Sequence, residues 1–349
     1  MKNGHLFVLT YEMDESSRLL SHQAGVVNQL ATIFEKVTVL TGKVGVYSAP
    51  MNVKIYSSEW QQGKRIKSSI KFMSIFLKII SQNKFNAIVS HMTSAQSALV
   101  APITKIYRIK HYLWYTHTSN NLSLKFCALL TDGILTATTG SCPIKGSKVH
   151  VIGHSIDTQM FNKKKEYIFP LNKFVHIGRF DPIKNIEKIL ETICGLKLIH
   201  KDILFTNFGD PSSEVGIKYQ RRVVKEYSDK KFLDYITFRD SLNRNDVPGI
   251  LKSKDAFIHA CDAGLDKALL EATLTGLPVV TINKQYLEIF GHWSKNDYLT
   301  GNQLLIEALA LQELSESSLR IELNRRYELA LLHADLKVWA IKVKEIIES

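Results

Sequence analysis

Short apolar runs, many of them β-branched, alternate along this chain with longer segments in which apolar residues recur at helical spacing. This alternation is typical of a parallel sheet whose strands are joined by helices. In the first half it predicts strands at 6–10, 37–41, 87–91, 111–115 and 149–152, and helices at 25–34, 65–82, 95–107 and 122–130. In the second half it predicts strands at 174–177, 203–208, 236–238, 256–260 and 279–282, and helices at 185–197, 215–227, 246–253 and 267–274.

The two halves are separated by a segment that has no period. Residues 162–170 are charged and end in Pro170, which is typical of a linker. We therefore expect two doubly wound α/β domains, at 1–165 and 166–332, and a terminal helix within 333–349. Ligands of such sheets bind beyond the carboxyl ends of the strands, so we expect the site in the crevice between the domains.

Composition narrows the class of partner. The chain has 349 residues, of which 45% are apolar and 22% charged, as in globular proteins. With 45 basic and 33 acidic residues, its formal net charge is +12. A negatively charged partner is therefore expected. Nucleic acid, an anionic membrane surface and a diphosphate-bearing metabolite all meet this requirement, and charge does not choose among them.

The cysteines and the first residues bear on the compartment. Cys127, Cys142, Cys194 and Cys261 are scattered and have no Cys-x-x-Cys spacing, which favours a reducing compartment without disulfides or a zinc site. The opening residues lack a signal cleavage site, and no apolar stretch is long enough to span a bilayer. We expect a cytoplasmic protein, at most peripheral on the inner face of the membrane.

The strongest local signal follows the first strand of the second half. This strand ends at Gly178, Arg179 comes next, and Lys184 stands where a helix begins. Glycine permits close backbone approach, and two cations beside a helix N-terminus suit a diphosphate. Asn185 is the expected N-cap of that helix. The alternative is an ordinary strand–loop–helix junction with two solvated cations.

A second signal lies at 260–280, where another buried strand leads through a glycine-containing loop into a helix. We expect Asp266 to cap this helix, and an anion near its first turn would explain Lys267. Glu271 lies one turn further on the same face, where a carboxylate can accept ribose hydroxyls. The alternative is a surface ion pair between Lys267 and Glu271.

Together the two segments resemble the family 4 glycosyltransferases, the glycogen-synthase-like group of the GT-B fold. Gly178-Arg179 with Lys184-Asn185 is similar to that family's glycine–arginine…lysine segment, and 263–271 to its glutamate-x7-glutamate segment. Residues 151–161 resemble its interdomain crossing. The first glutamate of the family falls on Ala263, which leaves the donor sugar open, with Asp262 or Asp266 as candidate substitutes.

The resemblance implies a fold and an activity. We expect two Rossmann-like domains facing across a cleft, with the terminal helix packed back on the first. The activity expected is retaining transfer of a hexosyl group from a nucleotide-diphosphate sugar to a saccharide or lipid-linked acceptor in surface polysaccharide, lipopolysaccharide or glycolipid synthesis. No cofactor is expected. The sequence contains no Asp-x-Asp at a strand end and no metal-spaced cluster, so we also expect no metal.

The resemblance also assigns residues. Gly178, Arg179, Lys184, Asp266, Lys267 and Glu271 are expected to bind the donor, and His117, Arg179 and Lys184 to serve catalysis. His117 follows a strand end of the first domain, and a structural histidine is the alternative there. Gln23 and Gly25 match the family's acceptor loop only weakly, because one glycine is kept.

Three alternative classes remain at the level of sequence. One is a nucleotide-sugar epimerase of the same fold, and another is a non-catalytic relative, because of Ala263. The third is a basic nucleic-acid-binding protein, although no known aromatic–basic motif is present.

One further segment, 64–80, is amphipathic. It carries an apolar stripe and, beside it, a basic stripe. The apolar stripe comprises Ile66, Ile70, Met73, Leu77 and Ile80, and the second stripe comprises Lys67, Lys71, Ser74 and Lys78. The basic stripe suits an anionic membrane surface, and the alternative is a helix packed on the sheet with solvated lysines.

Overall fold

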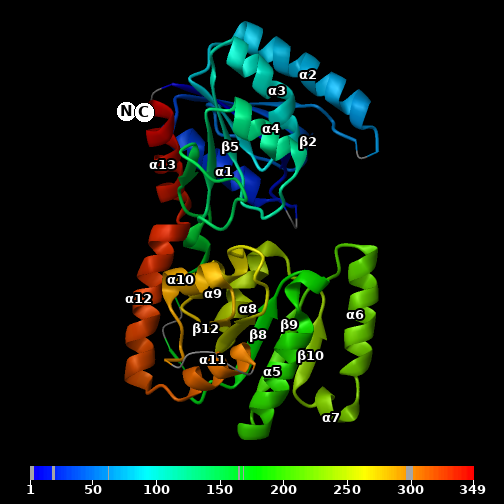
Figure 1. Cartoon of the computed structure of the whole chain (residues 1–349), viewed down its shortest axis with the longest axis vertical. Helices are drawn as coiled ribbons and strands as arrows, with labels where there is room; N and C mark the ends of the chain where they lie inside the picture. Colours follow the sequence, from blue (N-terminus) through cyan, green and yellow to red (C-terminus); the bar gives the residue numbers. More distant parts are fainter. Residues whose placement is uncertain (1–3, 18–19, 62, 164–165, 168, 296–301) are drawn as a thin grey trace. The chain divides into compact units, whose positions relative to one another are not determined.

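The computed structural model describes residues 4–17, 20–61, 63–163, 166, 167, 169–295 and 302–349. The chain forms two compact units, each described by itself: unit 1 is Met1–Asp157 with His333–Ser349, and unit 2 is Thr158–Leu332 (Figure 1). The first boundary thus falls eight residues before the expected 165/166, and the second falls at 332/333. Within the expected linker 162–170, residues 164, 165 and 168 lie outside the described residues.

The described part of unit 1 contains a seven-stranded parallel sheet. Its order is β3-β2-β1-β4-β5-β6-β7, so the direction of winding reverses between β1 and β4. The strands are β1 His5–Met13, β2 Lys36–Val44, β3 Val53–Ser57, β4 Ala87–His91, β5 Lys110–Trp114, β6 Gly133–Thr136 and β7 Val149–Val151. All of them were expected except β3 and β6.

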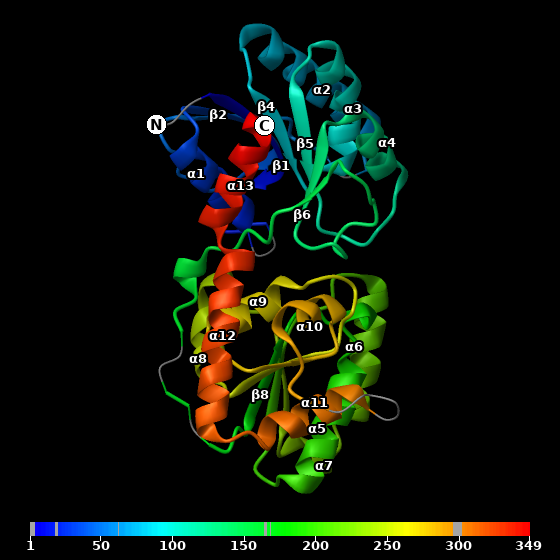
Figure 2. The ribbon, with the colours of Figure 1, turned by 60° about the vertical axis from the view of Figure 1, so that its left-hand side comes forward.

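Helices cover both faces of this sheet. On one face, α1 (His22–Ile33) packs beside the terminal helix α13 (Leu336–Glu348), as Figures 1 and 2 show. On the other face lie α2 (Arg65–Gln82), α3 (Ser94–Ile106) and α4 (Leu122–Leu130). Trp339 of α13 is fully buried and meets Trp114 of β5 edge-on, with 5.3 Å between ring centroids. The terminal helix is therefore part of the core of unit 1, as expected.

The helix at 65–82 has the predicted bounds, but only part of the apolar stripe that the sequence suggested is on its buried face: Ile80 is buried and Met73 packs against the core. Phe72, Phe76 and Ile79 are buried, and the Phe76 ring stacks on Phe7 at 5.6 Å. In contrast, Ile66 is 80% exposed and Ile70 66% exposed. Two apolar stripes at helical spacing compete in this sequence, and the one with the phenylalanines buries more area.

The chain passes from unit 1 to unit 2 beside the point where it returns. The His154 N–H donates to the His333 carbonyl at 2.6 Å, and the Ile156 N–H donates to Ala334 at 2.8 Å. Gly153 has a φ of +86°, and an added Cβ would lie 2.6 Å from the His333 carbonyl oxygen. The glycine is therefore required by both its backbone conformation and this close approach.

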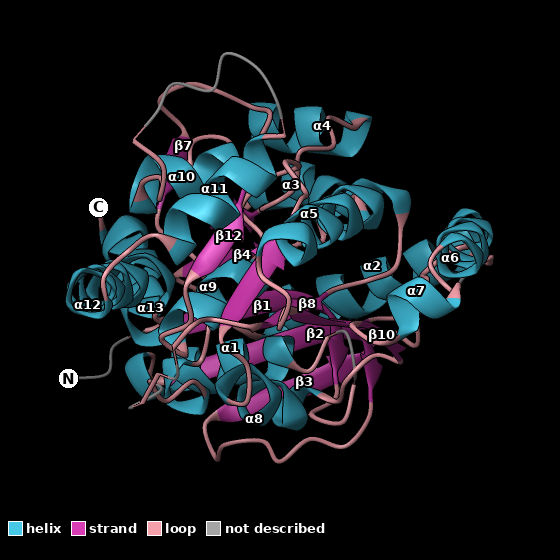
Figure 3. Cartoon of the chain, turned by 90° about the horizontal axis from the view of Figure 1, so that it is seen from below, coloured by secondary structure: helices cyan, strands magenta, loops and turns pink. Residues whose placement is uncertain are grey.

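Unit 2 contains a second parallel sheet, of five strands in its described part, in the order β10-β9-β8-β11-β12. The strands are β8 Lys173–Ile177, β9 Leu204–Phe208, β10 Ile236–Arg239, β11 Ala256–His259 and β12 Val279–Thr281. The helices, cyan in Figure 3, are α5 Ile186–Ile199, α6 Glu214–Glu226, α7 Lys230–Leu233, α8 Val247–Lys252, α9 Lys267–Leu274, α10 Lys284–Phe290, α11 Gln303–Gln312 and α12 Glu316–Ala334, whose last two residues belong to unit 1.

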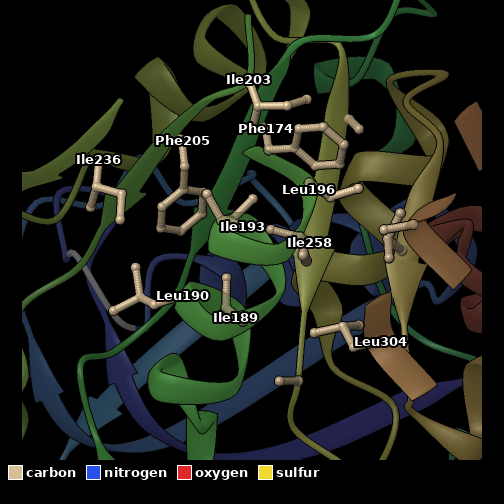
Figure 4. Close-up of a cluster of buried hydrophobic side chains, with 14 of the residues drawn as sticks. Phe174, Ile189, Leu190, Ile193, Leu196, Ile203, Phe205, Ile236, Ile258 and Leu304 are labelled. Carbon is tan, nitrogen blue, oxygen red and sulfur yellow. The ribbon is translucent and has the colours of Figure 1, made fainter. Parts of the chain in front are cut away.

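The core of unit 2 forms between this sheet and α5 (Figure 4). Ile189, Leu190 and Ile193 of α5 meet Phe174 of β8 and Phe205 of β9, and all of them are essentially inaccessible to solvent. Strands buried on both faces read as continuous apolar runs, which is why the sequence revealed them. The four cysteines are free, and Cys194 alone is only half-buried.

No helix among the described residues is long and apolar enough to cross a bilayer.

Candidate functional site

The winding of unit 2 reverses between β8 and β11, and the candidate residues of the sequence follow these two strands. At such a switch point the adjacent connections leave on opposite faces and open a crevice at the carboxyl edge of the sheet. We call the polar residues gathered there the switch-point cluster. Its members are Arg179, Lys184, Arg244, His259, Asp266, Lys267 and Glu271.

Two glycines bring the loops after β8 and β9 together. The Gly178 N–H donates to Phe208 at 3.0 Å, and the Phe180 N–H donates to Asp210 at 2.9 Å. An added Cβ at Gly209 would lie 1.8 Å from the carbonyl oxygen of Gly178, so no larger residue fits. Gly178 is similarly confined, since its Cβ would lie 2.9 Å from Nε2 of His176.

Arg179 projects from this junction with 54% of its side chain exposed. Its Nη1 donates to Oγ of Ser212 at 3.1 Å and lies 3.6 Å from Oδ2 of Asp181. Asp181 in turn accepts hydrogen bonds from the backbone and hydroxyl of Ser212. The guanidinium is thus held by one edge near the start of α6, while most of it faces solvent, as a donor to an anionic ligand should.

Lys184 lies deeper, with 12% of its side chain exposed, and forms an ion pair with Asp266. It ends the 3₁₀ turn Pro182–Lys184. Asn185 follows in the left-handed conformation, with φ +50°, and its side chain makes no capping bond to α5. Asn185 therefore occupies the expected N-cap position of α5, but without the side-chain hydrogen bond that such a cap usually supplies.

Asp266 binds three groups. As expected, it caps α9, accepting from the Ala268 N–H at 3.3 Å, and it also pairs with Lys184 and lies 3.3 Å from Nε2 of the fully buried His259. Burial alone would raise the pKa of Asp266, but the hydrogen bond from His259 and the ammonium of Lys184 hold that pKa well below its ordinary value. Asp266 is therefore an anion that fixes the position of Lys184.

Glu271 has a partner that the sequence did not reveal. Its carboxylate, 7% exposed, accepts from Nη1 of Arg244 at 2.6 Å, whereas the pairing considered from sequence was with Lys267 at the surface. The Arg244 guanidinium also stacks over the Phe161 ring at 5.1 Å. Burial raises the pKa of Glu271, and Arg244 opposes that rise. The surface-pair alternative is wrong, because the carboxylate is buried.

Lys267 completes the positive side of the cluster. Burial lowers its pKa to about 8, although the carboxylates of Glu271 and Asp266 oppose that shift. Asp262, considered as a substitute for the carboxylate missing at Ala263, is occupied elsewhere: its Oδ1 accepts from the Lys284 N–H at 2.9 Å. Nδ2 of Asn283 donates hydrogen bonds to the carbonyl oxygens of Cys261 and Gly264 in the same loop, at 3.0 and 2.6 Å.

The candidates in unit 1 have a different setting. His117 is exposed in the loop three residues beyond β5, and its Nδ1 accepts from the Ser119 N–H at 3.0 Å. Gln23 is buried inside the first turn of α1, not in a loop, and its Oε1 accepts from the N–H groups of Tyr11 and Glu12. Gly25 also lies within α1, where an added Cβ would meet nothing within 4 Å. Gly25 is therefore not required by local packing.

The described residues contain no group of three His, Cys, Asp or Glu side chains arranged to hold a metal ion.

Several solved structures of known proteins are similar to this chain in fold. The chain is similar in structure to Anabaena HepE solved with UDP and glucose, at 12% identity over 98% of this chain and 99% of that one, with a TM-score of 0.72. It is also similar to sucrose-phosphate synthase of Thermosynechococcus elongatus, at 12% identity, 99% and 98% coverage and a TM-score of 0.75. A third similar structure is WaaG, a glycosyltransferase of lipopolysaccharide biosynthesis, at 14% identity, 98% and 99% coverage and a TM-score of 0.64.

These likenesses define the class: an α/β protein of the GT-B fold, with two Rossmann-like units. The family follows from sequence. Residues 159–330 match the family model described as "Glycosyl transferases group 1", and this segment, which holds the whole switch-point cluster, belongs to that family. A search of curated protein sequences finds no significant match to the chain.

Proposed function

We propose that the chain is a retaining glycosyltransferase that moves a hexosyl group from a nucleotide-diphosphate sugar to a saccharide or lipid-linked acceptor. One observation carries this proposal: Arg179, Lys184 and Glu271 gather at the switch point of a sheet that belongs to the group 1 glycosyl transferases. HepE, a structural neighbour, was solved with UDP-glucose, which supports a donor of this kind.

The diphosphate is assigned to Arg179 and Lys184. Arg179 supplies a planar fork of N–H groups, of which the Ser212 contact uses only one nitrogen. Lys184 supplies a point charge, and its partner Asp266 keeps that charge in place until the diphosphate arrives. Both cations meet negative charge that grows as the glycosidic bond breaks, so they stabilise the transition state more than the ground state. No metal ion is required in this scheme.

The nucleoside is assigned to Glu271. Arg244 contacts its Oε1, which leaves Oε2 to accept ribose hydroxyls. Burial raises the pKa of Glu271 and Arg244 opposes that rise, which favours the ionised carboxylate, and an ionised carboxylate accepts stronger hydrogen bonds than a neutral acid. Arg244 is therefore a positioning residue for the nucleoside, acting through Glu271. Retention of configuration and the surface-polysaccharide, lipopolysaccharide or glycolipid product are parts of the proposal that rest on family resemblance.

The test is a thermal-shift screen with nucleoside diphosphates and their sugars, followed by product analysis. A ligand at 100 times its dissociation constant stabilises the folded state by about 2.7 kcal/mol, which raises the midpoint measurably. The expected result is a shift with one nucleotide family, and an α-linked product from an α-linked donor by NMR. Epimerised donor without transfer, or no shift with any nucleotide, would overturn the proposal. Activity that disappears in chelator and returns with Mg²⁺ would overturn its metal-independent part.

A further inference from the structure

The outer layer of unit 1 formed by α2, α3 and α4 has an unusual charge distribution. These three helices contain six basic residues and no acidic one. The basic residues are Arg65, Lys67, Lys71, Lys78, Lys105 and Lys125. α3 packs against both of its neighbours, and Figure 1 shows the three helices side by side. One of these cations, Lys71, pairs with Glu59.

The same layer exposes large apolar side chains. On α2, Ile66, Ile70 and Leu77 are exposed and follow one another at helical spacing. On α4, Leu122, Phe126 and Leu129 are exposed at the same spacing, with Leu122 at 84%. Neither set contributes to the core, because Phe72, Phe76 and Ile79 of α2 and Leu124 of α4 do so. We call these two apolar rows and the six cations of the three helices the α2–α4 face.

We infer that the α2–α4 face binds an anionic lipid bilayer. Apolar side chains beside lysines are the pattern of an interfacial helix, in which the apolar row enters the headgroup region and the cations meet lipid phosphates. The charge of the three helices is complementary to such a surface, since none of them contains an acidic residue, and the exposed Glu59, which precedes α2, pairs with Lys71. This inference concerns the surface alone and does not depend on the sugar-transfer proposal.

Two other occupants fit less well. A second copy in an isologous dimer would place the same basic rows against each other across the two-fold axis. Nucleic acid would be met by cations, but it offers no apolar phase for Ile66, Ile70 and Leu122. A bilayer satisfies both the charge and the apolar rows.

The experiment is flotation of the full chain with vesicles of phosphatidylglycerol and phosphatidylcholine, and with vesicles of phosphatidylcholine alone. The charge variant is Arg65→Glu, Lys67→Glu and Lys78→Glu together; Lys71 is kept because it pairs with Glu59. Its matched control is Lys218→Glu, Arg221→Glu and Lys225→Glu on α6, which are equally exposed and reverse the same charge on a helix that already carries acidic residues. The apolar variant is Ile66→Ser with Ile70→Ser.

The wild type and the α6 control are expected to bind the anionic vesicles and ignore the neutral ones. The α2 charge variant is expected to lose binding by on the order of 10²-fold, since each basic residue near the surface contributes a several-fold factor. The apolar variant is expected to weaken binding by about 10-fold or more. All variants should melt with the wild type, because the changed side chains are exposed.

Several outcomes would overturn the inference. These are no wild-type binding at low salt, equal losses in the α2 and α6 charge variants, and no loss in the apolar variant. Light scattering that shows a dimer dissociated by the α2 changes would assign the face to a second copy. Displacement of the vesicles by a generic oligonucleotide would assign it to nucleic acid. Nucleotide-induced thermal shifts are measured separately, so a failure here leaves the sugar-transfer test intact.

Discussion

The polar edges of the two units are built in different ways. In unit 2 the candidate residues hold one another: Lys184 meets Asp266, Asp266 meets His259, and Glu271 meets Arg244. In unit 1, the exposed His117 accepts a hydrogen bond from the Ser119 N–H, two positions away in its own loop. A set of residues held by mutual contacts is preorganised for one kind of ligand. His117 has no such mutual contacts with other candidate residues, so its orientation depends on the ligand that it contacts.

The largest effect is expected at the diphosphate. Arg179→Ala or Lys184→Ala should lower kcat/KM by on the order of 10²-fold or more, with turnover falling as well as donor affinity, because both cations meet charge that develops in the transition state. Arg179→Lys should rescue poorly, since an ammonium lacks the planar fork. Arg221→Ala on α6 is the matched control. Two well-folded alanine variants with unchanged kinetics would show that Arg179 and Lys184 are solvated cations of an ordinary strand–loop–helix junction and do not bind the diphosphate.

Next in size is the loss of the partner of Glu271. Arg244→Ala leaves a carboxylate that is only 7% exposed without its ion pair, and should lower the free energy of unfolding by about 1–3 kcal/mol at neutral pH. Burial raises the pKa of Glu271 above its ordinary 4.5, so the folded variant takes up a proton more readily than the unfolded chain. The difference in the free energy of unfolding between the variant and the wild type should therefore shrink as the pH falls through the pKa of Glu271. Urea unfolding measures this difference.

A second substitution makes this result specific. Arg244→Ala with Glu271→Gln should recover part of the lost stability, because a buried amide needs no counter-charge. If the double variant is no more stable than Arg244→Ala, the loss comes from the packing of Arg244 on Phe161 and not from the ion pair.

A smaller effect is expected at Lys267, whose pKa burial lowers to about 8. If its ammonium contacts the donor, affinity should fall by up to about 10-fold per pH unit above pH 8, as the free protein loses that proton. Lys267→Arg should abolish this decline, because a guanidinium stays charged throughout the range. The measurement is donor affinity by calorimetry between pH 7 and 10. An identical decline in the arginine variant would remove Lys267 from the donor contacts.

The sequence was informative where structure is local. Strands buried on both faces stand out as apolar runs, and α2, α4 and α9 have their predicted bounds. β3 was missed because it is an edge strand in which no residue is fully buried and Lys54 is exposed, so it does not stand out as an apolar run; β6, with the sequence Gly133 to Thr136, was also missed. The period of α2 was clear, but a period cannot say which of two apolar stripes faces the sheet. That choice is made by packing against Phe7 and its neighbours.

The candidate site likewise contains residues that the sequence could predict and residues that it could not. Gly178, Arg179, Lys184 and Asp266 could be proposed because each stands within a few residues of a strand end or helix start. Arg244 could not, since it lies in a short 3₁₀ turn after β10 and reaches Glu271 only through the tertiary path of the chain. His259, the last residue of β11, reads as one more residue of a buried strand until its contact with Asp266 is seen.

The smallest effect is expected at His117 in unit 1. It lies three residues beyond the carboxyl end of β5. In the sheet of unit 1, β4 lies between β5 and the point where the strand order reverses. If it donates a hydrogen bond to the donor sugar, His117→Ala should lower kcat about 3- to 10-fold, as expected for about 1 kcal/mol, and leave nucleoside diphosphate affinity unchanged. The split between turnover and affinity matters more than its size, because a structural histidine would alter both together through the fold. Thr118→Ala, in the same exposed loop, is the matched control. A His117→Ala variant with wild-type turnover would assign His117 to structure only, and a comparable loss in Thr118→Ala would trace the effect to the loop.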